Sequence, residues 1–423
     1  MIMCWAIERS WVRSPPSAFI CFPPKNIHNY LNSCNAIFTM RPSLILIALI
    51  AFALLYAIVV SSLPGMVKFF LGIAEMFIVG QILIKYYKLT GEYGLIMLRS
   101  KKGIGIIHRL ARQYEKIWKF LSDTGVVISY GLLSFFLMRK HVSAKSLITG
   151  LVLLSVIFIF VAPAALGVLI SLLGVSMIER SSQQLAAFSP IFSLSILLVL
   201  IGGLFLFFLL GLIAYGLVIL AALLSTLLQG TAAISQTTPG AHLLLPGINL
   251  PFFEGILALL IILVVHEGAH AVMARIGKIP ILSSGLVLFG VIPIGAFVEP
   301  DEKKLKKLER TRQTRVLVAG STANLIASIL LFTVFLGFIT GINYLGLVNI
   351  EMLIPVLRFI SIVLGLGFAL NFVIGTVNLL PLPFFDGYRT MEINVPQKNV
   401  LRAITIITLV AFLLNFLPWL FVA

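Results

Sequence analysis

The chain has 423 residues, of which 60% are hydrophobic and only 11% are charged, and its mean hydropathy is +1.10. These values exclude an ordinary soluble globular protein and indicate a polytopic membrane protein. The formal net charge of +16 does not indicate a nucleic-acid-binding protein, because the basic residues gather in short loops between apolar runs, which is the positive-inside pattern of cytoplasmic loops.

The first 39 residues differ from the rest of the chain. They are rich in Pro, Ser and Asn, and they contain all three cysteines, Cys4, Cys21 and Cys34. They show neither apolar periodicity nor the apolar core of a signal peptide. We interpret residues 1–39 as a disordered tail or an over-extended start that precedes the natural Met40, with a genuine flexible extension as the alternative. No cysteine follows to serve as a metal ligand.

Residues 40–230 form a predicted N-terminal transmembrane region. Apolar runs predict membrane spans at 43–63 and 66–84. The segment 85–122 is polar and strongly basic. We therefore predict a cytoplasmic segment there, with an amphipathic helix near 106–120.

The apolar runs that complete this region leave the number of spans open. The run at 126–138 is short for a span, whereas the runs at 147–177 and 191–228 are long. The last run is too long for one straight helix and just long enough to fold as two. Gly202 and Gly203 predict a break or a close helix contact within it.

Residues 231–423 form the predicted core of the chain. The run 252–274 predicts an inward-running helix, because Arg275 and Lys278 follow it. Glycine and proline among Leu, Val, Ile and Phe predict an extended or hairpin-like segment at 279–298. The remaining predicted elements are a charged inner segment at 301–315, an outward span at 316–339, an inward span at 359–380 and an outward span at 403–421.

These elements together predict the fold class. We expect an all-α polytopic membrane protein, a bundle of about eight to ten transmembrane helices. A small extended or β-hairpin segment follows the helix at 252–274. We expect the chain to be a multi-pass protein of the cell membrane.

The sequence HEGAH at 266–270 lies inside the apolar run 252–274. Residues four apart share one face of an α-helix, so His266 and His270 can bind one metal ion. Glu267 lies beside the first histidine, where it can reach a water molecule at the metal. An ionisable group at membrane depth costs on the order of 3 kcal/mol, so it persists mainly where it is functional or paired. A polar patch that faces the helix bundle is the alternative.

Two histidines leave a zinc ion in need of another protein ligand. Asp386 is the candidate, because it follows the inward span at 359–380 and so lies at a depth similar to that of the histidines, toward the cytoplasmic side. Pro381 and Pro383 prevent a regular helix before it. Broken backbone at membrane depth is tolerated where protein or a water-filled cavity covers it. An Asp-Gly surface turn paired with Arg389 is the alternative.

Asn378 begins the segment NLLPLPFFDG that contains Asp386. Its amide has two roles open to it. It either caps backbone groups that the end of the helix frees, or it faces the reacting carbonyl and stabilises the oxyanion that forms there. The residues themselves do not choose between the two.

The sequences HEGAH and NLLPLPFFDG together resemble the site-2 protease family of intramembrane zinc metalloproteases, whose motifs are HExxH and NxxPxxxxDG. Both match at every fixed position. Between them, residues 318–324 (VAGSTAN) resemble the family's Ala-Gly-Pro-x-x-Asn stretch, with Ser321 where proline is common. The resemblance covers about residues 247–387. Residues 40–230 resemble only loosely the multi-span leader of long prokaryotic or archaeal members, and the loop 341–352 is too short for the PDZ domain that many members carry.

This resemblance implies a zinc-dependent endopeptidase that hydrolyses peptide bonds in or near transmembrane segments of membrane proteins. It implies that His266, His270 and Asp386 bind one zinc ion per chain and that Glu267 is the general base. The expected partners are membrane-protein substrates with a transmembrane helix and the lipid bilayer, with no nucleic acid. A substrate helix must unwind locally to expose a peptide bond. The segment 286–298 would then pair with it by β-addition, or would simply line the bundle as a loop.

Two other functions remain open. A membrane zinc protease of the prenyl-protein or heat-shock type would also use HExxH, but it would take a glutamate as third ligand from a downstream helix. The glutamates after His270 lie in charged or loop segments. A transporter-like protein would also place polar groups beside interrupted helices, but both motifs lie at one depth and the chain shows no inverted repeat.

Overall fold

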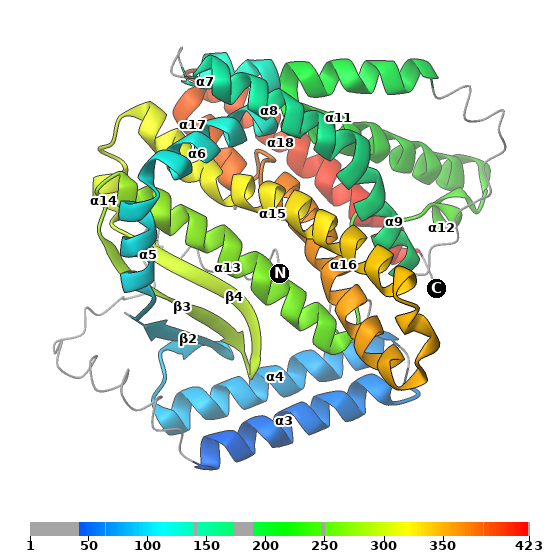
Figure 1. Cartoon of the computed structure of the whole chain (residues 1–423). Helices are drawn as coiled ribbons and strands as arrows, with labels where there is room; N and C mark the ends of the chain where they lie inside the picture. Colours follow the sequence, from blue (N-terminus) through cyan, green and yellow to red (C-terminus); the bar gives the residue numbers. More distant parts are fainter. Residues whose placement is uncertain are drawn as a thin grey trace.

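The computed structural model describes residues 42–63, 65–100, 102–138, 142–172, 189–242, 244, 246, 250–383 and 385–421. The interpretation of residues 1–39 lies outside this described part. Within it, nine helices are long and apolar enough to cross a membrane, and they accompany one small antiparallel sheet (Figure 1). The predicted all-α polytopic fold is therefore confirmed, and the chain is a multi-pass membrane protein.

The predicted spans at 43–63 and 66–84 are present as α3 and α4. In chain order, the described elements of the N-terminal half are α3 (Pro42–Val60), α4 (Gly65–Tyr87), β1 (Gly91–Glu92), β2 (Leu95–Ser100), α5 (Lys102–Gln113), α6 (Glu115–Tyr130), the 3-10 helix η1 (Gly131–Leu133), α7 (Ser134–Met138), α8 (Ala144–Val156), the π-helical turn η2 (Ile157–Val161), α9 (Ala162–Leu172), α11 (Ser189–Gln229) and α12 (Ala233–Gln236).

The basic segment predicted at 85–122 ends earlier than expected, because the next candidate membrane span begins at Glu115. Its amphipathic helix is α5, and α6 then continues into α7 to form one candidate span, Glu115–Met138. The short apolar run at 126–138 is therefore the second half of a longer span. Asp123 reads as a loop residue in the sequence, but it forms an ion pair with Arg315 inside the protein.

The long apolar run predicted at 191–228 is α11, and it is broken at Gly203. This residue has φ 63° and ψ −162°, which a side chain would strain. A Cβ atom there would also lie 2.5 Å from the carbonyl carbon of Ser129 and 2.5 Å from the amide nitrogen of Tyr130. Gly203 therefore provides both the break and the close helix contact that the sequence offered as alternatives.

The predicted core begins with the motif helix, which is present as α13. In chain order, the elements of the C-terminal half are α13 (Phe252–Ile276), β3 (Ile281–Phe289), β4 (Ile292–Pro300), α14 (Glu302–Leu305), α15 (Arg310–Tyr344), the 3-10 helices η3 (Leu347–Asn349) and η4 (Glu351–Leu353), α16 (Ile354–Val377), α17 (Asp386–Asn394), α18 (Lys398–Phe416) and the 3-10 helix η5 (Leu417–Leu420).

The segment predicted to be extended at 279–298 is an antiparallel hairpin of β3 and β4. Sequence analysis missed the two strands that join it, β1 and β2. The four strands lie in the order β1-β2-β3-β4, so β3 is paired on both sides and β4 forms one edge of the sheet. Leu286 of β3 lies between Leu98 of β2 and Ala296 of β4.

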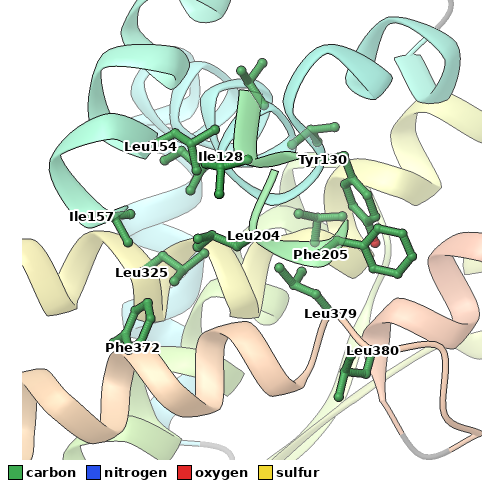
Figure 2. Close-up of a cluster of buried hydrophobic side chains, with 14 of the residues drawn as sticks. Ile128, Tyr130, Leu154, Ile157, Leu204, Phe205, Leu325, Phe372, Leu379 and Leu380 are labelled. Atoms are coloured by element: carbon green, nitrogen blue, oxygen red, sulfur yellow. The ribbon is translucent and has the colours of Figure 1, made fainter. Parts of the chain in front are cut away.

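The main hydrophobic core joins the N-terminal helices to the C-terminal ones. Figure 2 shows Ile128 of α6, Leu204 of α11, Leu325 of α15 and Phe372 of α16 within one buried cluster. The cluster extends to Leu379 and Leu380, which directly follow α16. Burial of these side chains removes apolar surface from contact with lipid and water alike, so the core fixes the position of the segment that leads to Asp386.

Helix α13 occupies the middle of the C-terminal half. It contacts β4 on one side and both α15 and α16 on another (Figure 1). α15 in turn contacts α6, α16 and α17. The motif helix is therefore held between the sheet and the helices α15 and α16, and α16 leads directly into the second motif.

Candidate metal centre

Side chains from the two predicted motifs meet inside the protein. The Nε2 atoms of His266 and His270 lie 3.2 Å apart, and the Oδ2 atom of Asp386 lies 3.2 Å from the first and 3.1 Å from the second. His266 and Asp386 are 2% and 1% exposed. One face of α13 supplies both histidines, and α17 supplies Asp386 as its first residue. The structure thus brings the three predicted ligands together.

The spacing of these three atoms fits a zinc ion. Tetrahedral zinc holds nitrogen and oxygen ligands at about 2.0–2.1 Å, which places any two ligand atoms about 3.3 Å apart. The three observed separations are 3.1, 3.2 and 3.2 Å. One ion can therefore contact all three atoms and keep a fourth position for a non-protein ligand. Among the described residues, no other group of three or more His, Cys, Asp or Glu side chains is placed to hold a metal.

A backbone carbonyl determines which nitrogen of His270 faces the site. The Nδ1 atom of His270 lies 2.7 Å from the carbonyl oxygen of Val316. A carbonyl oxygen only accepts, so Nδ1 carries the hydrogen and donates it. In the neutral ring, Nε2 then presents a lone pair toward the carboxylate of Asp386. Lone pairs of nitrogen and oxygen that point at one another are stabilised by a proton or by a metal ion between them, and a metal ligand set has this arrangement.

The ring of His266 also has a polar partner on α15, the helix that contains Val316. Its Nδ1 atom lies 3.1 Å from the side-chain amide nitrogen Nδ2 of Asn324, and Asn324 is 0% exposed. A histidine that binds metal through one nitrogen commonly has its other nitrogen hydrogen-bonded, because this fixes the orientation of the ring. Both imidazoles of the site are therefore held from α15.

Gly320 lies midway between these two contacts on α15. A Cβ atom at Gly320 would lie 2.6 Å from Nε2 of His266 and closer still to Nε2 of His270. Residues 316, 320 and 324 are four apart and form one stripe along the helix. The absence of a side chain at the centre of this stripe leaves the space where the two Nε2 atoms and the carboxylate converge.

The segment after α16 positions Asp386. Pro381 and Pro383 prevent continuation of the helix, and the chain turns back at once. The amide of Gly387 donates to the carbonyl oxygen of Asn378 at 2.8 Å and closes the segment. Gly387 packs so closely on the backbone of Leu379 that a Cβ atom would overlap it. Asp386 is thus directed inward by its own segment.

The structure excludes the alternative in which Asp386 lies in a surface turn and pairs with Arg389. Asp386 is buried, and Arg389 donates to Glu302 at 3.1 Å. Asn378 lies at the C-terminal end of α16, is 8% exposed, and contributes its backbone carbonyl to the closed segment. This contact gives Asn378 a structural role, and a role of its amide at the reacting carbonyl remains a hypothesis.

Glu267 is buried on α13 directly after the first histidine, at 8% exposure. It offers a carboxylate in the interior of an apolar helix bundle. The group suited to metal, His266, His270 and Asp386, contains no glutamate. Glu267 therefore directly follows the first member of this group in the sequence and lies outside the group.

Sequence reasoning missed the polar contacts that α15 makes with the two histidines. Asn324 and Gly320 lay in the stretch that resembles a family motif, but no function was assigned to them. The signal was present in the spacing: 316, 320 and 324 repeat at four residues, as His266 and His270 do. Two such stripes on antiparallel helices bring their members face to face.

Comparison with known proteins agrees with this geometry. An uncharacterized protein of Methanocaldococcus jannaschii is 38% identical over 100 residues, which are 24% of this chain and 27% of that protein. The chain thus covers about a quarter of the length of this relative. No solved structure matches the chain. Residues 254–418 match peptidase family M50, a family of metallopeptidases, and these residues include both motifs. The C-terminal part of the chain, residues 254–418, is therefore similar to peptidase family M50, as its two motifs predicted.

Proposed function

We propose that the chain is a zinc-dependent intramembrane endopeptidase that hydrolyses peptide bonds in or near transmembrane segments of other membrane proteins. The observation that carries this proposal is the convergence of His266 and His270, from a candidate membrane span, with Asp386, from the segment that follows another span. Ionisable groups at membrane depth persist where they serve a function, and this group has the composition and spacing of a zinc site.

The residues of the site have distinct roles in this proposal. A bound zinc ion would polarise the scissile carbonyl and lower the pKa of a water molecule toward about 7. Glu267 takes the proton from the attacking water and returns it to the leaving amine. Burial in a helix bundle keeps Glu267 and the reacting groups in a medium where their charges are weakly screened.

The substrate would be an unwound stretch of a membrane-spanning helix. Its freed backbone groups need partners inside the membrane. β3 is occupied on both sides, so the segment 286–289, which we first expected to pair with substrate, is already paired. β4 is an edge strand that contacts the motif helix α13. We therefore propose that a substrate strand adds to the free edge of β4.

The site would lie toward the cytoplasmic side of the membrane. Arg275 ends α13 shortly after the motif, and a run of basic residues follows β4 at 303–315. Asp386 follows the inner end of α16. Basic residues mark the cytoplasmic ends of membrane spans, so both halves of the site share that side.

The two alternative functions find less support. A protease of the prenyl-protein or heat-shock type requires a glutamate ligand, and the group suited to metal in the described residues has Asp386 in that place. A transporter function would not explain why three side chains suited to binding a metal ion lie together. The zinc content of the purified protein distinguishes a metallopeptidase from a transporter, because a metallopeptidase holds one zinc ion per chain.

Cleavage of a membrane-spanning model substrate tests the proposal. The purified full chain in detergent is given one apolar helix with soluble tags at both ends. We expect the wild type to cleave it and Glu267→Gln to lose about 10³-fold in rate, with zinc retained in both. Glu254→Gln, in the first turn of the same helix, is the matched control and should keep activity. Equal rates for wild type and Glu267→Gln, or a wild type without zinc, would refute the proposal.

A further inference from the structure

We propose that Asn324 is a positioning residue for His266. Its side-chain carbonyl accepts the hydrogen on Nδ1 of His266 and so holds Nε2 toward Asp386 and His270. This inference deepens the proposed function and rests on it, because it concerns how the chain prepares the site for zinc.

The burial of Asn324 shows that its amide is used at this one contact. The side chain is 0% exposed, and the structure places its amide nitrogen Nδ2 3.1 Å from Nδ1 of His266. The amide oxygen Oδ1 is buried and has no hydrogen-bond partner among the described residues. Burial of a polar amide is costly, so an amide with a single partner is retained for what that partner gains.

The chemistry of the ring decides which amide atom faces it. A neutral imidazole has one nitrogen that donates and one that accepts. Nε2 of His266 lies 3.2 Å from a carboxylate oxygen and 3.2 Å from Nε2 of His270, so a zinc ion held there needs its lone pair. Nδ1 must then carry the hydrogen. The side-chain amide of Asn324 must therefore be turned by about 180° when zinc is bound, so that the acceptor Oδ1 takes the place of Nδ2 opposite Nδ1. The amide nitrogen and oxygen of Asn are distinguished by such partners, not by their shape.

This contact completes a symmetric support from α15. Val316 accepts from Nδ1 of His270, and the turned amide of Asn324 would accept from Nδ1 of His266 through Oδ1. The two supports differ in kind. The carbonyl of Val316 belongs to the backbone and survives any substitution, whereas Asn324 acts through a side chain and can be tested by mutation.

The test measures zinc affinity on the full chain in detergent by competition with a chelator. We expect Asn324→Leu to bind zinc about 10- to 100-fold more weakly, because the ring loses its orientation. Asn324→Asp retains an acceptor toward Nδ1 and should keep most of the affinity. Asn371→Leu is the matched control, because Asn371 is equally buried but donates only to Gly367 of its own helix.

The visible spectrum of the Co²⁺-substituted protein gives a second readout. We expect the tetrahedral bands of the wild type to be kept in Asn324→Asp and Asn371→Leu, and to be altered in Asn324→Leu. If the leucine variant does not fold, Asn324→Ala removes the amide without added bulk and is measured in its place.

The outcomes separate this inference from the proposed function. Zinc affinity in Asn324→Leu equal to that of the wild type would overturn the positioning role and leave the protease proposal intact. An aspartate variant as weak as the leucine variant would also overturn it. A wild type that binds no zinc would overturn the proposed function, and the positioning role with it.

Discussion

Arg315 of α15 donates two hydrogen bonds to Asp123 of α6, from Nε at 2.6 Å and from Nη2 at 2.9 Å. Ser122 adds a third contact, because its hydroxyl donates to the carbonyl oxygen of Arg315 at 3.1 Å. The next residue, Val316, provides the carbonyl that holds His270. The helix α6 therefore anchors the part of α15 that faces the metal site.

Removal of one partner of this ion pair should destabilise the protein. Asp123→Leu leaves the guanidinium of Arg315 without its partner, and breaking a buried pair costs about 3–5 kcal/mol. We expect the lower end, about 3 kcal/mol, because Arg315 is 20% exposed. Asp123→Leu combined with Arg315→Met should recover much of the loss. Denaturant unfolding in detergent measures both.

The exposed pair of Glu115 and Lys119 on the same helix gives the control for this experiment. Glu115→Gln should leave the free energy of unfolding unchanged, because solvent screens that pair. A double variant at Asp123 and Arg315 that is as unstable as the single one would contradict the explanation.

Gly320→Ala should abolish zinc binding while the fold survives. The added methyl group would occupy the space between the two Nε2 atoms, 2.6 Å from that of His266. Gly337→Ala is the matched control, because it lies on the same helix and a Cβ atom there meets nothing within 4 Å. Helical content by circular dichroism should match in the two variants. Full zinc content in Gly320→Ala would show that the ligands converge elsewhere.

Zinc should stabilise the wild type against heat but not the variant Asp386→Asn. A ligand that binds the folded chain alone raises its stability by about 4 kcal/mol at a thousand times its dissociation constant. An amide is a weaker zinc ligand than a carboxylate, so the variant should lose this gain. Thermal midpoints with zinc and with a chelator make the comparison. An equal zinc-induced shift in both proteins would exclude Asp386 as a ligand.

A cysteine in β4 should form a disulfide with a cysteine in a bound substrate. Ile294→Cys lies on the edge strand beside α13, whereas Glu92→Cys lies in β1, at the opposite edge of the sheet. We expect cross-linking at the first position alone, with Glu267→Gln as background so that substrate accumulates. Equal cross-linking at both edges would argue against addition of a substrate strand to β4.

Acid should weaken the fold through His242, which lies between two candidate spans. Burial lowers its pKa below 6.5, more than its hydrogen bond to Pro239 raises it. The unfolded chain therefore binds this proton more readily, so the contribution of His242 to stability is complete above about pH 6.5 and is lost as the pH falls through the folded pKa.

The ring of His242 packs edge-on against Trp419, with centroids 5.3 Å apart. His242→Phe should preserve this contact and remove the titration. We expect the thermal midpoint to fall less in the variant than in the wild type between about pH 8 and about pH 5. An identical fall in both would assign the acid sensitivity to other groups.

Much of the fold could be predicted from local signals. Apolar length identified α3, α4, α13 and α15, and glycine and proline among apolar residues identified the hairpin of β3 and β4. The break at Gly203 also followed from sequence. These features depend on residues close together in the chain, which a single sequence displays directly.

The features that were missed depend on partners far apart in the chain. β2 lies in a basic segment, and its pairing with β3 joins Leu98 to Leu286. Sequence analysis placed the start of the span that contains Asp123 too late, because a charged residue is not expected inside a span. The partner that balances this charge, Arg315, lies far downstream in the chain. Asn324 was passed over for the same reason, since its partner is His266 on another helix. Pattern alone cannot pair such residues.

The stripe formed by Val316, Gly320 and Asn324 makes the register of α15 a determinant of metal affinity. Advancing the helix by one residue would turn its face by about 100° and remove all three contacts together. Arg315 ties that same register to α6. A shift of the N-terminal helices against residues 231–423 would therefore weaken the proposed binding of zinc, and by thermodynamic reciprocity bound zinc would oppose the shift.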